Sequence, residues 1–134
     1  MALRLLQTCG ANFQGAGIGT AGIDFVGGVH PDPYWSNHVL GNVRQMPFSE
    51  IWQNTSDVLL QGLRDRLPLL RGRCGNCRWK ETCGGNLRVR AAQFYGDPWT
   101  SDPACYLTNQ EIGKEVTEQV EALEDDVLLP EQAA

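Results

Sequence analysis

The sequence lacks the features that would place it in a membrane or on a secretory route. None of its apolar runs approaches the ~20 residues that a helix needs to cross a bilayer. The segment from Met1 to Cys9 is too short to hold the charged, apolar and cleavage regions of a signal peptide. Internal repeats and low-complexity tracts are absent as well. We therefore expect a cytoplasmic, globular protein with no membrane partner.

A basic overall charge is also missing. The net charge is -5, and eight of the 16 acidic residues lie in the last 24 positions, beside a single lysine. Eight of the 11 basic residues fall between Arg64 and Arg90. The acidic balance argues against nucleic acid as a partner, whereas the basic centre suits a small anionic ligand.

The composition indicates one small, loop-rich domain. Hydrophobic residues make up 42% of the 134 residues, enough for a core, but 15 glycines and 7 prolines interrupt the pattern. The pair Gly27-Gly28 is a hairpin turn signal, and Pro31 cannot donate to a strand ladder. We expect a β-hairpin over about residues 18–31, after an irregular lead-in over residues 1–17.

Short helices are predicted after this hairpin. A helical turn over residues 47–52 would be capped by Ser49. A helix from Ser56 to about Arg66 would be capped by Ser56 and would bury the apolar side chains at positions 58, 59 and 63. A third helix over residues 86–94 would turn Leu87, Ala91 and Phe94 to one apolar face, with Arg88 pointing elsewhere, and would stop at Gly96.

The last predicted helix is the clearest. Thr108 to Glu111 fits a capping box, and apolar residues recur at positions 112, 116, 120 and 123. We expect an amphipathic helix over residues 108–124, followed by an acidic, frayed tail over residues 125–134. The expected fold class is therefore α+β, with a hairpin, short helices around a four-cysteine site and a C-terminal helix.

The cysteines carry the strongest signal. Four of the five follow the spacing C-x2-C-x5-C-x21-C. Thiols stay reduced in the cytosol, so clustered cysteines indicate a metal before they indicate disulfides. Structural zinc favours two C-x2-C knuckles, whereas a larger [4Fe-4S] cluster accepts one knuckle plus dispersed ligands. The spacing favours iron–sulfur and leaves zinc and unligated thiols open. The predicted metal ligands are Cys74, Cys77, Cys83 and Cys105.

The run from Cys74 to Asn86, with Cys105 later, resembles the SPASM/twitch extension that holds auxiliary [4Fe-4S] clusters in many radical SAM enzymes. The resemblance implies that these four cysteines are the ligands of one such cluster and that residues 18–107 form the SPASM/twitch-like domain. Ligands of a further cluster are mostly lost, because Asp32 and Leu87 stand at two of their positions. Cys9 is left without a ligand role.

Other segments narrow the resemblance to the radical SAM protein of haem d1 biosynthesis (NirJ-like). This similarity covers about residues 10–113. It implies a tetrapyrrole substrate related to siroheme, whose propionate side chains are altered, and it implies His30, Arg88 and Arg90 as candidate substrate contacts. The segments that carry it are GVHPD at 28–32, LGNVR at 40–44, FSEIW at 48–52, RCGNCRW at 73–79, GNLRVRA at 85–91 and DPACYL at 102–107.

The C-x3-C-x2-C motif that binds the SAM-cleaving cluster in that family does not occur in these 134 residues. We therefore expect an iron–sulfur auxiliary module that is a fragment or needs a partner to supply the radical SAM core. S-adenosylmethionine would enter only through that core, so enzyme activity of this chain alone stays open. The alternatives are a zinc-stabilised binding module without redox chemistry and a truncated product without an independent role.

Overall fold

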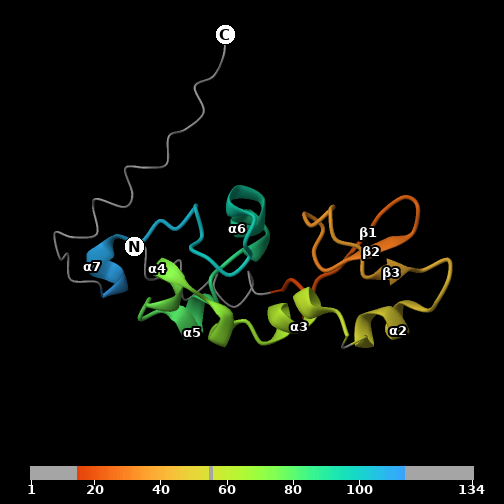
Figure 1. The fold of residues 1–134 in the computed structure, drawn as a ribbon, viewed down its shortest axis with the longest axis horizontal. Coiled ribbons are helices and arrows are strands. Elements are labelled where there is room, and N and C mark those ends of the chain that lie inside the picture. The colour runs from red at the N-terminus through yellow and green to blue at the C-terminus, as the bar shows by residue number, and fades with distance from the viewer. Residues whose placement is uncertain (1–14, 55, 114–134) are drawn as a thin grey trace, which may run out of the picture.

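The computed structural model of the protein describes residues 15–54 and 56–113. Its elements form an elongated arrangement with a small sheet at one end and the cysteine-bearing helices at the other (Figure 1). The described residues combine strands and helices, so the expected α+β class is confirmed. Within these ranges, no helix is both long and apolar enough to span a bilayer.

The sheet has three short antiparallel strands in the order β1-β2-β3. The strands are β1 (Gly22–Ile23), β2 (Gly28–His30) and β3 (Gly41–Asn42). Ile23 pairs with Val29, and Val29 pairs in turn with Gly41, which leaves Val29 fully buried at the centre. The hairpin predicted over 18–31 is confirmed, with shorter strands. The third strand was not predicted, because a two-residue strand carries no alternating pattern.

Two helices and a 3-10 turn follow the sheet. They are α2 (Phe48–Gln53), α3 (Val58–Arg64) and η1 (Leu67–Leu69). The predicted caps were wrong. Helix α2 begins after Pro47 without a side-chain cap, and the N-cap of α3 is Asp57, whose carboxylate accepts the N–H of Leu60 at 2.7 Å. Aspartate caps as well as serine does, and the helix begins one residue later than predicted.

One of the three core positions predicted for α3 was wrong. Val58 was expected in the core but is 81% exposed, whereas Leu60 and Leu63 are 0% exposed. Leu63 joins Ala16, Trp35 and Val89 in the main hydrophobic cluster, as predicted, and Leu59 packs against it. Leu60 and Leu63 lie three residues apart on one face of the helix, and Val58 lies on the opposite face.

The remaining helices are short. They are α4 (Gly72–Gly75), α5 (Lys80–Cys83), α6 (Arg88–Tyr95) and α7 (Asn109–Ile112). In α6 the predicted faces were partly wrong: Ala91 is buried as expected, but Arg88 is also fully buried and Phe94 is 57% exposed. The left-handed residues Gly84, Gly85 and Asn86 delay the start of α6 to Arg88. Its end before Gly96 is confirmed.

The capping box at α7 is confirmed, since the Thr108 side chain accepts the N–H of Glu111 and the Glu111 carboxylate accepts the N–H of Thr108. The predicted length was wrong. Gly113 takes a left-handed conformation with φ of 82° and ends the helix after Ile112. The apolar positions 116, 120 and 123, the tail over 125–134 and Cys9 all lie outside the described residues.

Candidate metal centre

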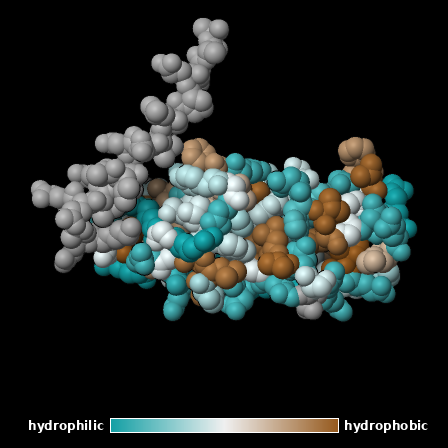
Figure 2. All heavy atoms as spheres, in the orientation of Figure 1, coloured by the Kyte–Doolittle hydropathy of each residue, from teal (hydrophilic) through white to brown (hydrophobic). Residues whose placement is uncertain are grey.

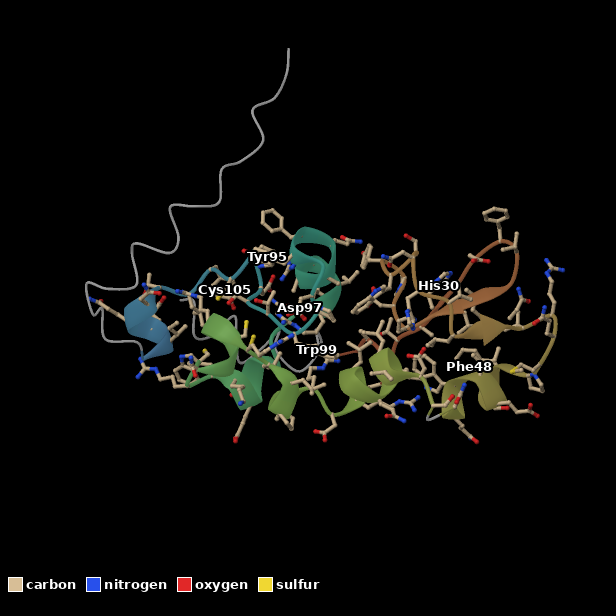
Figure 3. All side chains as sticks on the ribbon, viewed as in Figure 1. His30, Phe48, Tyr95, Asp97, Trp99 and Cys105 are labelled. Carbon is tan, nitrogen blue, oxygen red and sulfur yellow. The ribbon has the colours of Figure 1, made fainter. Side chains whose placement is uncertain are left out.

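Four cysteines line one cavity at the end of the molecule opposite the sheet. Cys74 lies in α4, Cys77 follows α4, Cys83 ends α5, and Cys105 lies in the loop between α6 and α7. All four are free thiols. Figure 3 shows sulfur atoms beside α4 and α5, close to the labelled Cys105. The other residues that line this cavity are Arg73, Lys80, Gly85, Leu107 and Ile112.

Glycines allow the chain to approach itself closely at this site. A Cβ on Gly75, between the first two cysteines, would lie 2.4 Å from the carbonyl oxygen of Leu70. After Cys83, Gly84 and Gly85 adopt φ of 58° and 74°, a region that side chains disfavour. The backbone thereby turns back toward the cavity directly after the third cysteine.

Backbone N–H groups point at two of the four sulfurs. The N–H of Trp79 donates to Cys77 Sγ at 3.4 Å, and the N–H of Asp102 donates to Cys74 Sγ at 3.3 Å. Such donors stabilise the thiolate form of cysteine, which is the form that binds metals.

The thiols also disfavour one another's ionisation. Burial raises the pKa of Cys83 to about 11, and the neighbouring Cys74, Cys105 and Cys77 add to this effect. Burial likewise raises the pKa of Cys77, while the N–H of Trp79 and the nearby Arg73 act in the opposite direction. Four crowded thiolates need a cationic centre among them, which fits a bound metal group.

The four cysteines line a common cavity. Within residues 15–54 and 56–113, no three histidine, cysteine or carboxylate side chains are placed to hold a single metal ion.

Helix α7 closes the cavity through contacts with the cysteine-bearing segment. The Arg73 guanidinium donates to Asn109 Oδ1 and to the carbonyl oxygen of Leu107. Nε of Arg78 and Nε1 of Trp79 both donate to the carbonyl oxygen of Glu111, each at 2.8 Å. Leu107 and Ile112 form a small hydrophobic cluster against Cys77, Cys83, Cys105 and Trp79.

The structure does not bring the predicted substrate residues together. His30 lies at the sheet end, far along the molecule from Cys105 (Figure 3). Its ring nitrogens contact Asp24 Oδ2 at 3.0 Å and the carbonyl oxygen of His38 at 2.8 Å. Arg88 is fully buried, so its side chain does not reach the surface. Arg90 is half-exposed and lines an open groove with Gln93, Phe94 and Pro103.

Sequence reasoning missed two carboxylates. Asp24 accepts the His30 contact, and Asp102 pairs with Arg90 and presents its N–H to Cys74. The sequence signals for Asp102 are its position three residues before Cys105 and its place at the start of the DPACYL segment. Asp32, which stands at a position where the SPASM pattern has a cysteine, caps a turn, since Oδ1 accepts the N–H of Tyr34 at 2.9 Å.

The pair of Asp24 and His30 gives a pH-dependent contribution to stability. The hydrogen bond from His30, followed by that from Gly28, lowers the pKa of Asp24 below 3.8. Burial disfavours the His30 imidazolium, but hydrogen bonds to Asp24 and to the His38 carbonyl outweigh it and raise the pKa above 6.5. The Asp24 contribution is lost as pH falls through its lowered pKa, and the His30 contribution is lost as pH rises through its raised pKa.

We therefore expect Asp24→Asn to reduce the free energy of unfolding most between pH 3.8 and 6.5, and least above the raised pKa of His30. Asparagine keeps the acceptor for Val26 and Gly28 and can donate to neutral His30, but it cannot pair with the imidazolium. Urea unfolding of both proteins across this range measures the difference. A decrease in the free energy of unfolding that does not vary with pH would contradict an ion pair between Asp24 and His30.

The fold and the cysteine-lined cavity define a small α+β protein with a four-thiol site. Comparison with curated proteins identifies its relatives. The chain is 49% identical over 112 residues to Fe-coproporphyrin III synthase of Methanosarcina barkeri, which covers 81% of this chain and 28% of that protein. It is 52% identical over 108 residues to pre-heme d1 synthase of Dinoroseobacter shibae, covering 81% of this chain and 26% of the relative.

An AdoMet-dependent heme synthase of Methanosarcina barkeri is 38% identical over 89 residues, or 66% of this chain. The chain is thus a relative of the radical SAM haem synthases of the pre-heme d1 type, as the resemblance implied. It spans about a quarter of the length of the curated relatives it matches. No family model and no solved structure matches the chain.

Proposed function

We propose that Cys74, Cys77, Cys83 and Cys105 hold a [4Fe-4S] cluster and that residues 18–107 are the SPASM/twitch-like auxiliary part of a radical SAM enzyme. The observation that carries the proposal is that four free cysteines line one cavity in a chain about half identical to pre-heme d1 synthase. When bound, such a cluster supplies one-electron redox chemistry and an anionic, sulfur-rich surface.

The arrangement of the donors favours a cluster over a single ion. The backbone N–H groups of Trp79 and Asp102 already point at Cys77 and Cys74. One C-x2-C knuckle with two dispersed cysteines suits a cluster, whereas structural zinc favours two knuckles. Arg73 and Lys80 line the same cavity and offset the negative charge of a thiolate-bound cluster.

The substrate class that we propose is a tetrapyrrole, on the strength of the relatives' names. Among the three predicted substrate contacts, Arg90 is the one that lines an open groove, beside the aromatic ring of Phe94. The aromatic ring of Phe94 suits the flat, apolar body of a macrocycle, and Arg90, whose Nε and Nη2 are paired with Asp102, adds a polar edge to the groove. His30 and Arg88 serve structural roles in this proposal.

The partner that we propose is a radical SAM core, which would bind S-adenosylmethionine. The relatives are about four times as long as the matched segment, so most of each lies outside it. Figure 2 shows hydrophobic side chains exposed over the middle and the sheet end of the molecule. At the sheet end, Phe25 is 93% exposed and Ile23 is 56% exposed, which suits contact with another part of such an enzyme.

Anaerobic reconstitution with ferrous iron and sulfide tests the proposal. We expect the full chain to bind about four irons and four sulfides and to absorb broadly in the visible range. Cys77→Ser is expected to lose most of this iron, because serine does not replace a thiolate ligand for iron. Cys9→Ser is the matched control, since Cys9 lies outside the cysteine motif, and it should bind as much iron as the unaltered protein.

Two results would contradict the cluster. A colourless protein with one tightly bound zinc would identify the binding module without redox chemistry. Equal iron content in the Cys77→Ser and unaltered proteins would show that the iron is not held by this cysteine motif.

A further inference from the structure

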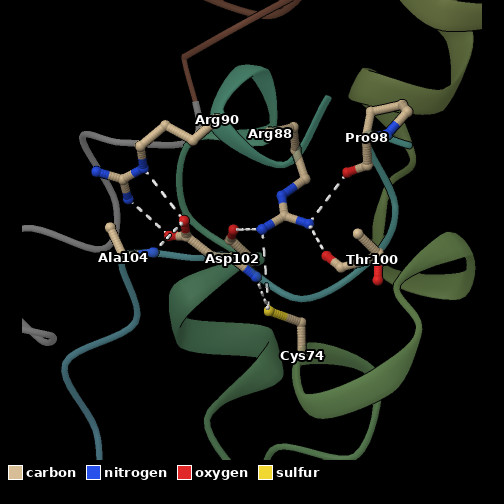
Figure 4. A network of polar contacts seen from close by, with 8 residues as sticks. Cys74, Arg88, Arg90, Pro98, Thr100, Asp102 and Ala104 are labelled. Carbon is tan, nitrogen blue, oxygen red and sulfur yellow. Dashed lines mark hydrogen bonds and ion pairs between the residues drawn. The ribbon is translucent and has the colours of Figure 1, made fainter. Parts of the chain in front are cut away.

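Arg88 is a buried cation with no carboxylate partner among the described residues. Its side chain is 0% exposed, although arginine is seldom buried without a counter-charge. Nη1 donates to the carbonyl oxygens of Pro98 at 3.0 Å and Thr100 at 2.6 Å, and Nη2 donates to that of Gly85 (Figure 4). These carbonyls accept from the two Nη atoms, while the buried Nε has no hydrogen-bond partner, and none of the carbonyls carries a full charge to balance the guanidinium.

The Cys74 sulfur is the group that can balance this charge. Nη2 of Arg88 lies 3.9 Å from Cys74 Sγ, and the backbone N–H of Asp102 donates to the same sulfur at 3.3 Å. Cys74 is 9% exposed, so water screens the contact weakly. A thiolate at this position receives one charged and one neutral donor inside the protein.

Hydrogen bonds to the carboxylate of Asp102 hold this residue in place. Its carboxylate, 2% exposed, accepts from Nη2 of Arg90 at 2.6 Å and from Nε at 3.1 Å. It also accepts the N–H of Ala104 at 3.1 Å. This pairing fixes the loop whose backbone N–H faces Cys74. Among the described contacts of the four cysteines, no other sulfur has a guanidinium within hydrogen-bond distance.

We propose that Arg88 is a positioning residue for the metal centre: it provides the internal counter-charge of Cys74, fixes its sulfur toward the cavity and raises the reduction potential of the cluster held there. The inference rests on the proposed function. Reduction adds one electron to an anionic site, and a fixed positive charge beside a ligand sulfur stabilises the more negative state. Asp102, oriented by Arg90, donates its N–H to the same sulfur.

Two variants of Arg88 distinguish the effect of its positive charge from the effect of its side-chain shape. Arg88→Gln and Arg88→Lys both shorten the side chain and lose its fork, but only lysine keeps a positive charge. We expect the reconstituted Arg88→Gln protein to have a more negative midpoint potential than the unaltered protein, with Arg88→Lys between them. Dithionite supplies the electron in the titration. Arg71→Met, which removes an exposed arginine paired with Asp97 and bonded to no sulfur, should leave the potential unchanged.

A second measurement needs no change at Arg88. In an Arg73→Lys background, which removes the guanidinium that lines the cavity, the arginine guanidinium nitrogens are labelled with ¹⁵N. Pulsed EPR of the reduced cluster is expected to detect coupling to ¹⁵N through the contact of Arg88 with Cys74. Absence of this coupling, or an Arg88→Gln potential equal to that of the unaltered protein, would overturn the inference. Failure of the unaltered protein to bind iron would instead overturn the proposed function.

Discussion

The substitution Gly75→Ala is expected to lower the free energy of unfolding by about 1–3 kcal/mol. It is also expected to prevent the reconstituted protein from retaining iron. The new Cβ would lie 2.4 Å from the carbonyl oxygen and 3.0 Å from the carbonyl carbon of Leu70. Backbone atoms cannot rotate away as a side chain can, so α4 must shift relative to η1. That shift displaces Cys74 and Cys77 together. Urea unfolding and iron analysis of the reconstituted protein measure both effects.

Gly19→Ala is the control for this substitution. No atom lies within 4 Å of a Cβ added at Gly19, and its backbone is not in the left-handed region. Stability should therefore change by less than about 0.5 kcal/mol, as for other open surface positions. If Gly75→Ala retained the iron and the stability of this control, the close approach of α4 to Leu70 would not be required by the site.

The second large effect is expected at Leu63. Its side chain is 0% exposed and packs with Ala16, Trp35 and Val89 in the main hydrophobic cluster. Truncation to alanine removes buried methyl groups and leaves a cavity, which costs about 2–5 kcal/mol. The protein that remains folded should bind iron in the same ratio, because Leu63 does not line the cysteine cavity.

Val58→Ala in the same helix provides the comparison. Val58 is 81% exposed, so its truncation should change the free energy of unfolding by less than about 0.5 kcal/mol. Urea unfolding of both variants tests which face of α3 packs against the core. Equal decreases in the free energy of unfolding for Leu63→Ala and Val58→Ala would mean that the helix packs with a different face from the one described.

The outline of the cysteine site could be predicted from the sequence, whereas its supporting contacts could not. The C-x2-C knuckle and the resemblance identified four cysteines, and the structure places all four around one cavity. The N–H groups that face Cys74 and Cys77 come from residues 28 and 2 positions further along the chain, respectively. The first of these depends on long-range folding, which spacing alone does not reveal.

The errors at helix ends have a common physical origin. Ser56 and Asp57 are both good caps, so a sequence with adjacent candidates leaves the start of α3 undetermined by one residue. Gly113 was read as part of an amphipathic helix because the apolar positions on either side fit the period, yet its left-handed conformation ends α7. Tertiary contacts choose between such local alternatives.

Arg88 shows where a rule based on residue type fails. A charged residue between apolar ones on a helix is expected at the surface, and Arg88 was accordingly assigned to the exposed side and to a substrate. The structure buries it against three carbonyl oxygens and a sulfur. Arg90, two positions later on α6, lines an open groove.

The contacts of α7 have a consequence for how the protein is made. Arg73, Arg78 and Trp79 donate to groups carried by residues 107–111, and these bonds close the cavity around the cysteines. When synthesis has reached Cys83, three of the four cysteines of the site exist, but residues 107–112, which close the cavity, do not. The nascent chain therefore passes through a stage in which an incomplete thiol site is open to oxygen and to stray metal ions, and the cavity is complete only after Ile112 has been added.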